Sequence, residues 1–209
     1  MTRILIADNH PVVRKGVKNI LADEFPDIVC GEAKSGPEAL EQVERHEWDL
    51  VILDITMPGQ SGLDVLKQIK ERRPKLPALV LSIHPEAQYG KRAFVAGASG
   101  YVNKESAPDD LVQAVRQILA GRMYVSRDMA ENLAAHVQPG SDRPPHESLS
   151  DREFEILRLI GSGKNTTQIA GQLHLSATTV STYRARILIK MNMKTTAELM
   201  HYALQNGLV

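Results

Sequence analysis

The chain has 209 residues, of which 43% are hydrophobic and 24% charged, and 25 basic residues balance 25 acidic ones. These proportions are typical of a globular protein, and no apolar run approaches the roughly 20 residues of a membrane span. Cys30 is the single cysteine, which excludes an intrachain disulfide. Because the first residues, MTRILIADNH, also lack a signal-peptide pattern, we expect a cytoplasmic protein.

Residues 1–121 alternate short β-rich runs with patterns of helical period. The runs expected as strands are residues 3–8, 27–33, 50–54, 78–82 and 100–103. They are nearly continuous in apolar residues, as in parallel strands that are covered on both faces. Five strands that alternate with five helices predict a doubly wound α/β domain over residues 1–121.

The pattern weakens between residues 122 and 148. The stretch RDMAENLAAHV fits a short helix, whereas QPGSDRPPHES has the proline, glycine and serine content of a linker. Its Pro144-Pro145 pair would stiffen part of that linker. We therefore expect a linker over residues 122–148 that contains at most one short helix.

Helix signals return clearly from residue 149 to residue 209. Ser150 and Glu153 have the spacing of a capping box, and Asn165 and Gln168 can begin a second helix in the same way. Ser176 is expected to cap a third helix that runs to about Met191, and a fourth helix should span roughly residues 195–206. Four short helices predict a small all-α domain.

Polar side chains stand at the ends of four predicted strands. Asp8 and Asp54 end the first and third, Ser82 ends the fourth, and Lys104 follows the fifth. Carboxyl ends of parallel strands meet at one edge of a sheet, where ligands bind, and the two acids are neighbours if the strand order is 2-1-3-4-5. Two carboxylates attract a hard divalent cation such as Mg²⁺, and a hydroxyl and an ammonium beside them suit phosphate chemistry.

These residues also carry a family resemblance. The stretches ILIADNHPVVRKG, LVILDITMPGQSGLDVL, LVLS and GASGYVNKE resemble the flavodoxin-like receiver domain of two-component response regulators. The stretch from LSDREFEILRLI to ILIKM resembles the LuxR-type helix-turn-helix, so the chain is similar to the NarL/FixJ subfamily. The resemblance implies that Asp54 accepts a phosphoryl group from a sensor histidine kinase and that the Thr56 carbonyl is a metal ligand. It also implies that Ser82 and Tyr101 form the conformational switch.

The chain departs from the receiver pattern at one position beside the first strand. Receivers of this kind generally carry two adjacent acidic residues there, whereas this chain has Asp8 and Asn9. Asn9 can still offer an amide oxygen to the metal, but one negative charge is missing. The alternative to a phosphorylated receiver is therefore a degenerate receiver that is controlled by protein contacts.

An enzyme acting on external phosphoesters is a further alternative, but DITMPG lacks the second aspartate that aspartyl phosphatases use two residues after the nucleophile. We therefore expect no enzyme, beyond catalysis by the receiver of its own phosphorylation and dephosphorylation.

The helix-turn-helix unit is expected over residues 165–184, with the start of its second helix in the major groove of double-stranded DNA. We expect Val180, Tyr183, Ile187 and Met191 to face the core. The expected DNA contacts are Lys164, Thr178, Thr179, Ser181, Thr182, Arg184, Ala185, Arg186 and Lys190. Threonine hydroxyls and Arg186 suit base edges or phosphates, whereas Lys164, Arg184 and Lys190 are expected on the phosphate backbone.

The net charge of residues 149–209 limits how strongly one copy of this region could bind DNA. Residues 149–209 contain 7 basic and 4 acidic side chains, so the charge available for DNA is modest. We therefore expect a homodimer on DNA, with RNA polymerase as a further partner of such a regulator. The alternative is a small helical bundle that contacts only proteins.

Overall fold

The computed structural model describes residues 1–58, 60–105, 108–126, 129–130 and 144–209. The chain divides into two compact units, residues 1–138 and 139–209. The division falls inside the stretch 122–148, and the domain limits at residues 121 and 149 stay predictions. The helix expected in RDMAENLAAHV lies, apart from residues 129 and 130, outside the described residues. No described helix combines the length and apolar character that crossing a bilayer requires.

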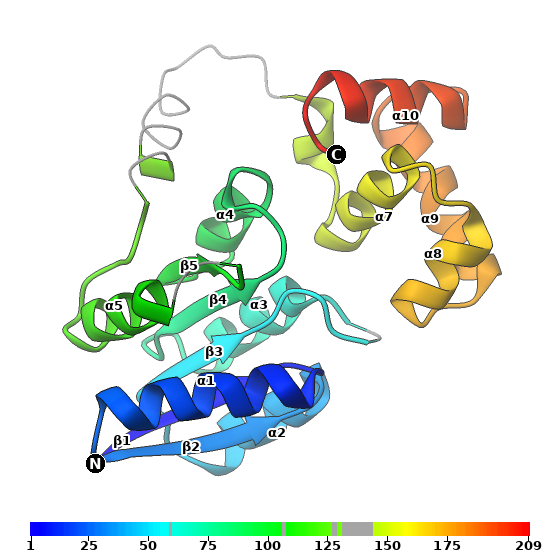
Figure 1. The fold of residues 1–209 in the computed structure, drawn as a ribbon. Helices are drawn as coiled ribbons and strands as arrows, with labels where there is room; N and C mark the ends of the chain where they lie inside the picture. The colour runs from blue at the N-terminus through cyan, green and yellow to red at the C-terminus, as the bar shows by residue number, and fades with distance from the viewer. Residues whose placement is uncertain (59, 106–107, 127–128, 131–143) are drawn as a thin grey trace. The chain divides into compact units, whose positions relative to one another are not determined.

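The first unit contains a five-stranded parallel sheet with the order β2-β1-β3-β4-β5, which confirms the predicted order (Figure 1). The strands are β1 (Thr2–Ala7), β2 (Ile28–Ala33), β3 (Leu50–Leu53), β4 (Ala78–Ser82) and β5 (Gly100–Asn103). Ala7 of β1 is in register with Leu53 of β3. The next residue on each strand, Asp8 and Asp54, therefore leaves the sheet at the same level.

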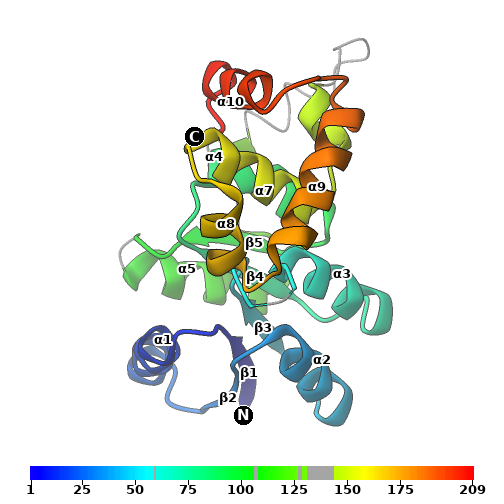
Figure 2. The ribbon, with the colours of Figure 1, turned by 90° about the vertical axis from the view of Figure 1, so that its right-hand side faces the viewer.

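Helices cover both faces of this sheet. They are α1 (Pro11–Glu24), α2 (Gly36–Arg45), α3 (Gly62–Arg72), α4 (Glu86–Val95) and α5 (Pro108–Leu119). Figure 2 shows α1 and α5 on one face and α2 and α3 on the other. On the face covered by α1 and α5, every second residue of the central strands enters one apolar cluster, for example Ile4, Ile6, Leu50 and Ile52. This two-layered burial explains the almost continuous apolar strands.

The second unit is all-helical over the residues that the structure describes. It contains the short 3-10 turn η1 (Pro145–Ser148) and the helices α7 (Asp151–Gly161), α8 (Thr166–Leu173), α9 (Ala177–Lys190) and α10 (Thr196–Gln205). The capping boxes predicted at Ser150 and Asn165 are both present, and Ser176 caps α9. His174 ends α8 in the left-handed region at φ 53° and makes the sharp turn between α8 and α9.

The buried face of α9 differs from the prediction at one residue. Val180, Ile187 and Met191 are buried as expected. Tyr183 is only partly buried and lines an open depression together with Arg186, whose guanidinium carbon lies 6.0 Å from the ring centre. The expectation that Tyr183 faces the core was therefore wrong.

Candidate functional site

The carboxyl edge of the sheet brings two buried carboxylates and one ammonium together. Asp8 and Asp54 are each only 2% exposed. The Lys104 ammonium nitrogen lies 2.6 Å from Asp8 Oδ2 and 2.9 Å from Asp54 Oδ2, and the Lys104 side chain is 10% exposed. The sequence predicted these three side chains at one edge, and the structure brings them into direct contact.

Backbone hydrogen bonds fix the two acids where they leave the sheet. The amide of Asp8 donates to the Ala33 carbonyl, and the amide of Asp54 donates to the Ala7 carbonyl. Behind Asp54 the chain turns back to begin α3 at Gly62. A Cβ on Gly62 would lie 1.9 Å from the Asp54 carbonyl oxygen, so only glycine lets α3 begin so close to the acid.

Burial raises the pKa of the Asp54 carboxyl above its ordinary value. The Lys104 ammonium opposes this rise, and the carboxylate of Asp8 adds to it. Desolvation therefore outweighs the attraction of the single cation, and the ionised Asp54 is only partly compensated by its surroundings. A second positive charge at this position would lower the cost of ionisation.

The residues at this edge fit a divalent cation. Asn9 Oδ1 is buried and makes no hydrogen bond. Neither carboxylate oxygen of Asp54 has a partner of good hydrogen-bond geometry, although the Lys104 ammonium is near Oδ2 and the Thr56 backbone amide also stabilises the charge. Buried oxygens without partners are costly unless a ligand satisfies them, and amide and carboxylate oxygens are the ligands that Mg²⁺ prefers.

Ser82 and Tyr101 lie on the neighbouring strands of the same edge. Ser82 is fully buried at the end of β4, and its hydroxyl oxygen accepts a hydrogen bond of 3.1 Å from the amide of His84. Tyr101, in β5, is 2% exposed and donates its hydroxyl to the His84 carbonyl at 2.7 Å. Burial raises the pKa of Tyr101, so its hydroxyl remains a hydrogen-bond donor. The structure thus holds Tyr101 in an inward position.

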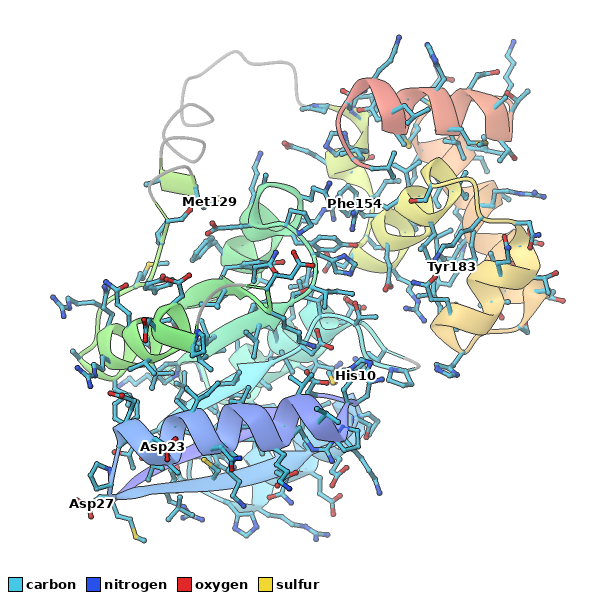
Figure 3. All side chains as sticks on the ribbon, in the orientation of Figure 1. His10, Asp23, Asp27, Met129, Phe154 and Tyr183 are labelled. Atoms are coloured by element: carbon cyan, nitrogen blue, oxygen red, sulfur yellow. The ribbon has the colours of Figure 1, made fainter. Side chains whose placement is uncertain are left out.

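Two histidines that the sequence reasoning did not select belong to this edge. His84 Nε2 lies 3.0 Å from Thr56 Oγ1, and the ring stacks on Tyr89 with 4.6 Å between ring centres. His10 Nδ1 lies 3.0 Å from Asp8 Oδ1. Figure 3 labels His10 at this edge, whereas Asp23 and Asp27 lie at the opposite end of the sheet. The sequence signal was available, because His84 follows Ser82 by two residues and His10 follows Asp8 by two.

In the second unit, most of the expected DNA contacts lie on the exposed side of α9. Thr178, Thr182, Ala185 and Arg186 are exposed, whereas Thr179, Ser181 and Arg184 are partly buried. An open depression on this side is lined by Ser176, Thr178, Thr179, Thr182, Tyr183 and Arg186. Hydroxyl and guanidinium groups therefore gather at the start of α9, as a DNA-reading helix requires.

Two of the expected backbone-contacting lysines are engaged within the unit. The Lys190 ammonium lies 2.7 Å from Oε2 of the buried Glu153, and the Lys164 ammonium donates to the side-chain oxygen of Gln172. Lys164 and Arg184 line a second cavity together with the first residue of α10, Thr196. The assignment of Lys164, Arg184 and Lys190 to DNA phosphates stays a prediction.

Comparison with known proteins covers both units. Residues 4–116 match the response regulator receiver domain, and residues 147–203 match the bacterial regulatory proteins of the luxR family. The chain is 34% identical to the response regulator UvrY of Escherichia coli K12 over all of its length and 96% of UvrY. It is 37% identical to the transcriptional activator protein ExaE of Pseudomonas putida, covering 99% of this chain and 97% of ExaE.

A solved structure is also similar to this chain over nearly its whole length. RcsB from Salmonella enterica serovar Typhimurium, bound to promoter rprA in the presence of the phosphomimetic BeF3-, is 25% identical with a TM-score of 0.64. The match covers 97% of this chain and 98% of RcsB. The expected resemblance and fold class are confirmed.

Proposed function

The chain belongs to the response regulators that join a receiver domain to a luxR-family DNA-binding domain, and from this we propose that phosphorylation of Asp54 controls its binding to specific DNA sequences. It would act as a transcriptional regulator in the cytoplasm. The observation that carries the proposal is the buried contact of the Asp54 carboxylate with Asp8 and Lys104 at the carboxyl edge of the sheet.

Asp54 is the proposed nucleophile. One of its carboxylate oxygens attacks the phosphorus of a phosphohistidine on the sensor kinase. An O–P bond forms and the N–P bond breaks, and the departing imidazole takes the electron pair and a proton. The Lys104 ammonium, which contacts both carboxylates, is positioned to donate to one phosphoryl oxygen, and Ser82 can donate its hydroxyl to another. Attack of water on the phosphorus of the acyl phosphate would break the O–P bond to Asp54, release inorganic phosphate and return the carboxylate. This hydrolysis concerns the protein's own phosphoryl group and no external substrate.

Four groups would hold Mg²⁺ at this edge: the side chains of Asp8, Asn9 and Asp54 and the backbone carbonyl of Thr56. When bound, the ion supplies positive charge that offsets the repulsion between the anionic donor and the attacking carboxylate. The unpartnered oxygens of Asn9 and Asp54 support this assignment. Asn9 contributes an oxygen without charge, so Asp8 and Asp54 carry the electrostatic attraction.

The switch would act through the loop between β4 and α4. The His84 backbone contacts both proposed switch residues, because its amide donates to Ser82 and its carbonyl accepts the Tyr101 hydroxyl. A phosphoryl group that binds the Ser82 hydroxyl would therefore change the hydrogen bonding of His84, and His84 is the residue that holds the Tyr101 hydroxyl inward. Differential stabilisation by a few kcal/mol is enough to shift such an equilibrium.

The α8 and α9 pair would read DNA, with the exposed threonines and Arg186 at base edges or phosphates. The RcsB structures include an RcsB–DNA complex and two RcsB dimers bound to two parallel DNAs. By analogy we propose that this chain binds double-stranded DNA as a homodimer. A sensor histidine kinase would be its phosphodonor, and RNA polymerase a further partner at promoters.

Genomic DNA selection with the full chain, with and without acetyl phosphate in Mg²⁺, tests this function. We expect a defined set of sequences whose binding tightens with the phosphodonor in the wild type. Asp54→Ala should abolish the increase, and Asp64→Ala, in the first turn of α3 with a side chain that is 40% exposed, should retain it. Sequence-specific binding that ignores both the phosphodonor and Asp54→Ala would instead favour a receiver controlled by protein contacts. Absence of any selected sequence would favour a protein-binding helical unit.

A further inference from the structure

An imidazole stands at the acidic edge beside the two carboxylates. Asp8, His10 and Asp54 each bring one ligand atom to within 4.8 Å of the other two. His10 Nδ1 is 3.0 Å from Asp8 Oδ1, and the His10 backbone amide donates to the same oxygen at 2.7 Å. The other oxygen of Asp8 contacts Lys104. The imidazole and the ammonium thus approach different oxygens of one carboxylate.

The oxygens at this edge are not saturated by the protein. Asn9 Oδ1 is buried without a hydrogen-bond partner, Asp54 Oδ1 has no partner of good hydrogen-bond geometry, and the Asp54 side chain is 2% exposed. Lys104 offsets only one of the two carboxylate charges. An unpartnered oxygen on a buried carboxylate indicates a ligand that is positively charged and small.

The loop that carries His10 is held firmly against the sheet. The Arg14 guanidinium donates to the Asp8 carbonyl at 2.8 Å and to Glu32 Oε2 at 2.9 Å. His10 itself precedes Pro11, whose ring restricts the backbone at the first position of α1. The imidazole is nevertheless 59% exposed, so an ion from solution can reach it directly.

The chemistry of the donor set favours some ions over others. Mg²⁺ prefers oxygen ligands and keeps several waters, and it gains little from an imidazole. Late first-row ions such as Co²⁺ and Zn²⁺ bind imidazole strongly, and they also accept carboxylates. Two carboxylates and one imidazole, with open positions, resemble the donor sets that hold such ions. Asn9 adds an oxygen without the charge that would strengthen Mg²⁺ binding.

We propose that His10 is a metal ligand at this site and that it shifts the preference of the site from Mg²⁺ toward late first-row divalent ions. The proposal rests on the proposed function, because it concerns the ion that would serve Asp54. It assigns to His10 a role in metal choice that Mg²⁺-dependent phosphorylation of Asp54 does not require.

Isothermal titration of the metal-free full chain with CoCl2 and, separately, with MgCl2 tests the proposal. His10→Ala should weaken Co²⁺ binding about 10-fold to 100-fold, in the range found when groups that support a metal site are lost, and should change Mg²⁺ binding less than about twofold. The visible absorption of bound Co²⁺ should also shift when the imidazole is lost. His46→Ala is the matched control, because His46 is an exposed receiver histidine that follows α2, before β3 begins. It should leave both affinities and the Co²⁺ spectrum as in the wild type.

The contradicting outcomes are distinct. If His10→Ala weakens Co²⁺ and Mg²⁺ binding equally and leaves the Co²⁺ spectrum unshifted, His10 only orients Asp8 by hydrogen bonding. If His10→Ala leaves Co²⁺ binding unchanged, His10 is not part of the metal site. Labelling of the wild type by acetyl phosphate in Mg²⁺ and, in a second sample, in Co²⁺ checks the proposed function separately. If the wild type is labelled but His10→Ala leaves Co²⁺ binding intact, the His10 proposal fails alone. If the wild type is not labelled in either ion while Co²⁺ binding depends on His10, the proposed function fails instead.

Discussion

The two units differ in how completely their buried charged side chains are paired. In the helical unit, Arg152 and Glu155 are 6% exposed, and their side chains meet at 2.7 Å, while the second guanidinium nitrogen of Arg152 donates to the Leu173 carbonyl. In the sheet unit, Asp54 and Asp8 share one ammonium, and Asp54 Oδ1 has no partner of good hydrogen-bond geometry. A buried charge with a full set of partners holds a structure together, whereas one without them marks a place for a ligand.

The pKa values of Glu153 and Asp54 shift in opposite directions, in agreement with this difference in pairing. Burial by itself would raise the pKa of Glu153, but hydrogen bonds from the Lys190 ammonium and from Ser150 bring it below its ordinary value. For Asp54 burial prevails, and the pKa rises despite Lys104. Ionised Glu153 therefore contributes to stability, and ionised Asp54 detracts from it.

The largest expected effect comes from breaking the buried ion pair of the helical unit. Arg152→Ala leaves Glu155 buried without its cation, and should lower the free energy of unfolding of the helical unit by about 3–5 kcal/mol. Urea unfolding of the full chain, followed by far-ultraviolet circular dichroism, measures the loss, and Trp48 fluorescence reports the sheet unit separately. Arg45→Ala, which removes an exposed pair with Glu41, should cost less than about 1 kcal/mol. Equal effects of the two variants would show that burial does not distinguish the pairs.

The second prediction separates charges that serve the fold from charges that serve DNA. Arg186→Ala should weaken binding to a selected DNA by about 1–3 kcal/mol, because Arg186 is exposed on α9. Lys190→Ala should weaken it less, because Lys190 is paired with Glu153. Fluorescence anisotropy over a series of salt concentrations measures both losses. A larger loss for Lys190→Ala would mean that the ion pair opens on DNA.

The third prediction concerns the capping box of α7. Glu153→Gln should lower the free energy of unfolding by about 1–2 kcal/mol at neutral pH, because it removes charge-assisted bonds to Lys190 and to the Ser150 amide. A lowered pKa means that the contribution is complete above the ordinary value of 4.5 and is lost as the pH falls through the lowered one. Unfolding measured at pH 7 and at pH 3 should therefore show the variant and the wild type converging in acid. A difference that is the same at both pH values would contradict the charge-assisted origin.

The smallest effect has the opposite sign. Asp54→Asn should raise the stability of the sheet unit by about 1 kcal/mol at neutral pH in a metal-free buffer, because it removes an incompletely compensated buried charge. A raised pKa means that ionised Asp54 destabilises the fold above that pKa, so the gain should shrink as the pH falls. Thermal unfolding with Trp48 fluorescence measures the change, and Asp64→Asn in the first turn of α3, where the Asp64 side chain is 40% exposed, is the control. A loss of stability in Asp54→Asn would mean that Asp54 is a satisfied structural acid.

Periodicity and capping residues were enough to predict most of the fold. The strand limits differ from the prediction by at most one residue at either end, because four of the five strands are short apolar runs with a polar residue at or directly after their end: β1, β3, β4 and β5. Helices α7, α8 and α9 are capped by Ser150, Asn165 and Ser176 as expected, because each cap is a local interaction between residues three apart. Tyr183 was misplaced, because helical spacing alone does not say how far a buried stripe extends.

The residues of the site that lie at strand ends could be predicted from the topology of the sheet. The contacts that depend on loop conformation and side-chain geometry could not. Asp8, Asp54 and Lys104 meet because parallel strands end at one edge. The contacts of His10 with Asp8 and of His84 with Thr56 depend on how two loops fold, and spacing in the sequence does not determine loop conformation. The engagement of Lys190 by Glu153 joins residues 37 apart, and no local pattern indicated it.

The central claim is that the incompletely satisfied carboxylate of Asp54 accepts a phosphoryl group. The most direct measurement is the fraction of full-length protein that carries an aspartyl phosphate after incubation with phosphoramidate and Mg²⁺, with the modified residue located by mass spectrometry. We expect labelling of the wild type at Asp54, labelling of Asp64→Ala to the same extent, and none in Asp54→Ala. Labelling that persists in Asp54→Ala, or a wild-type phosphate on another residue, would contradict the account.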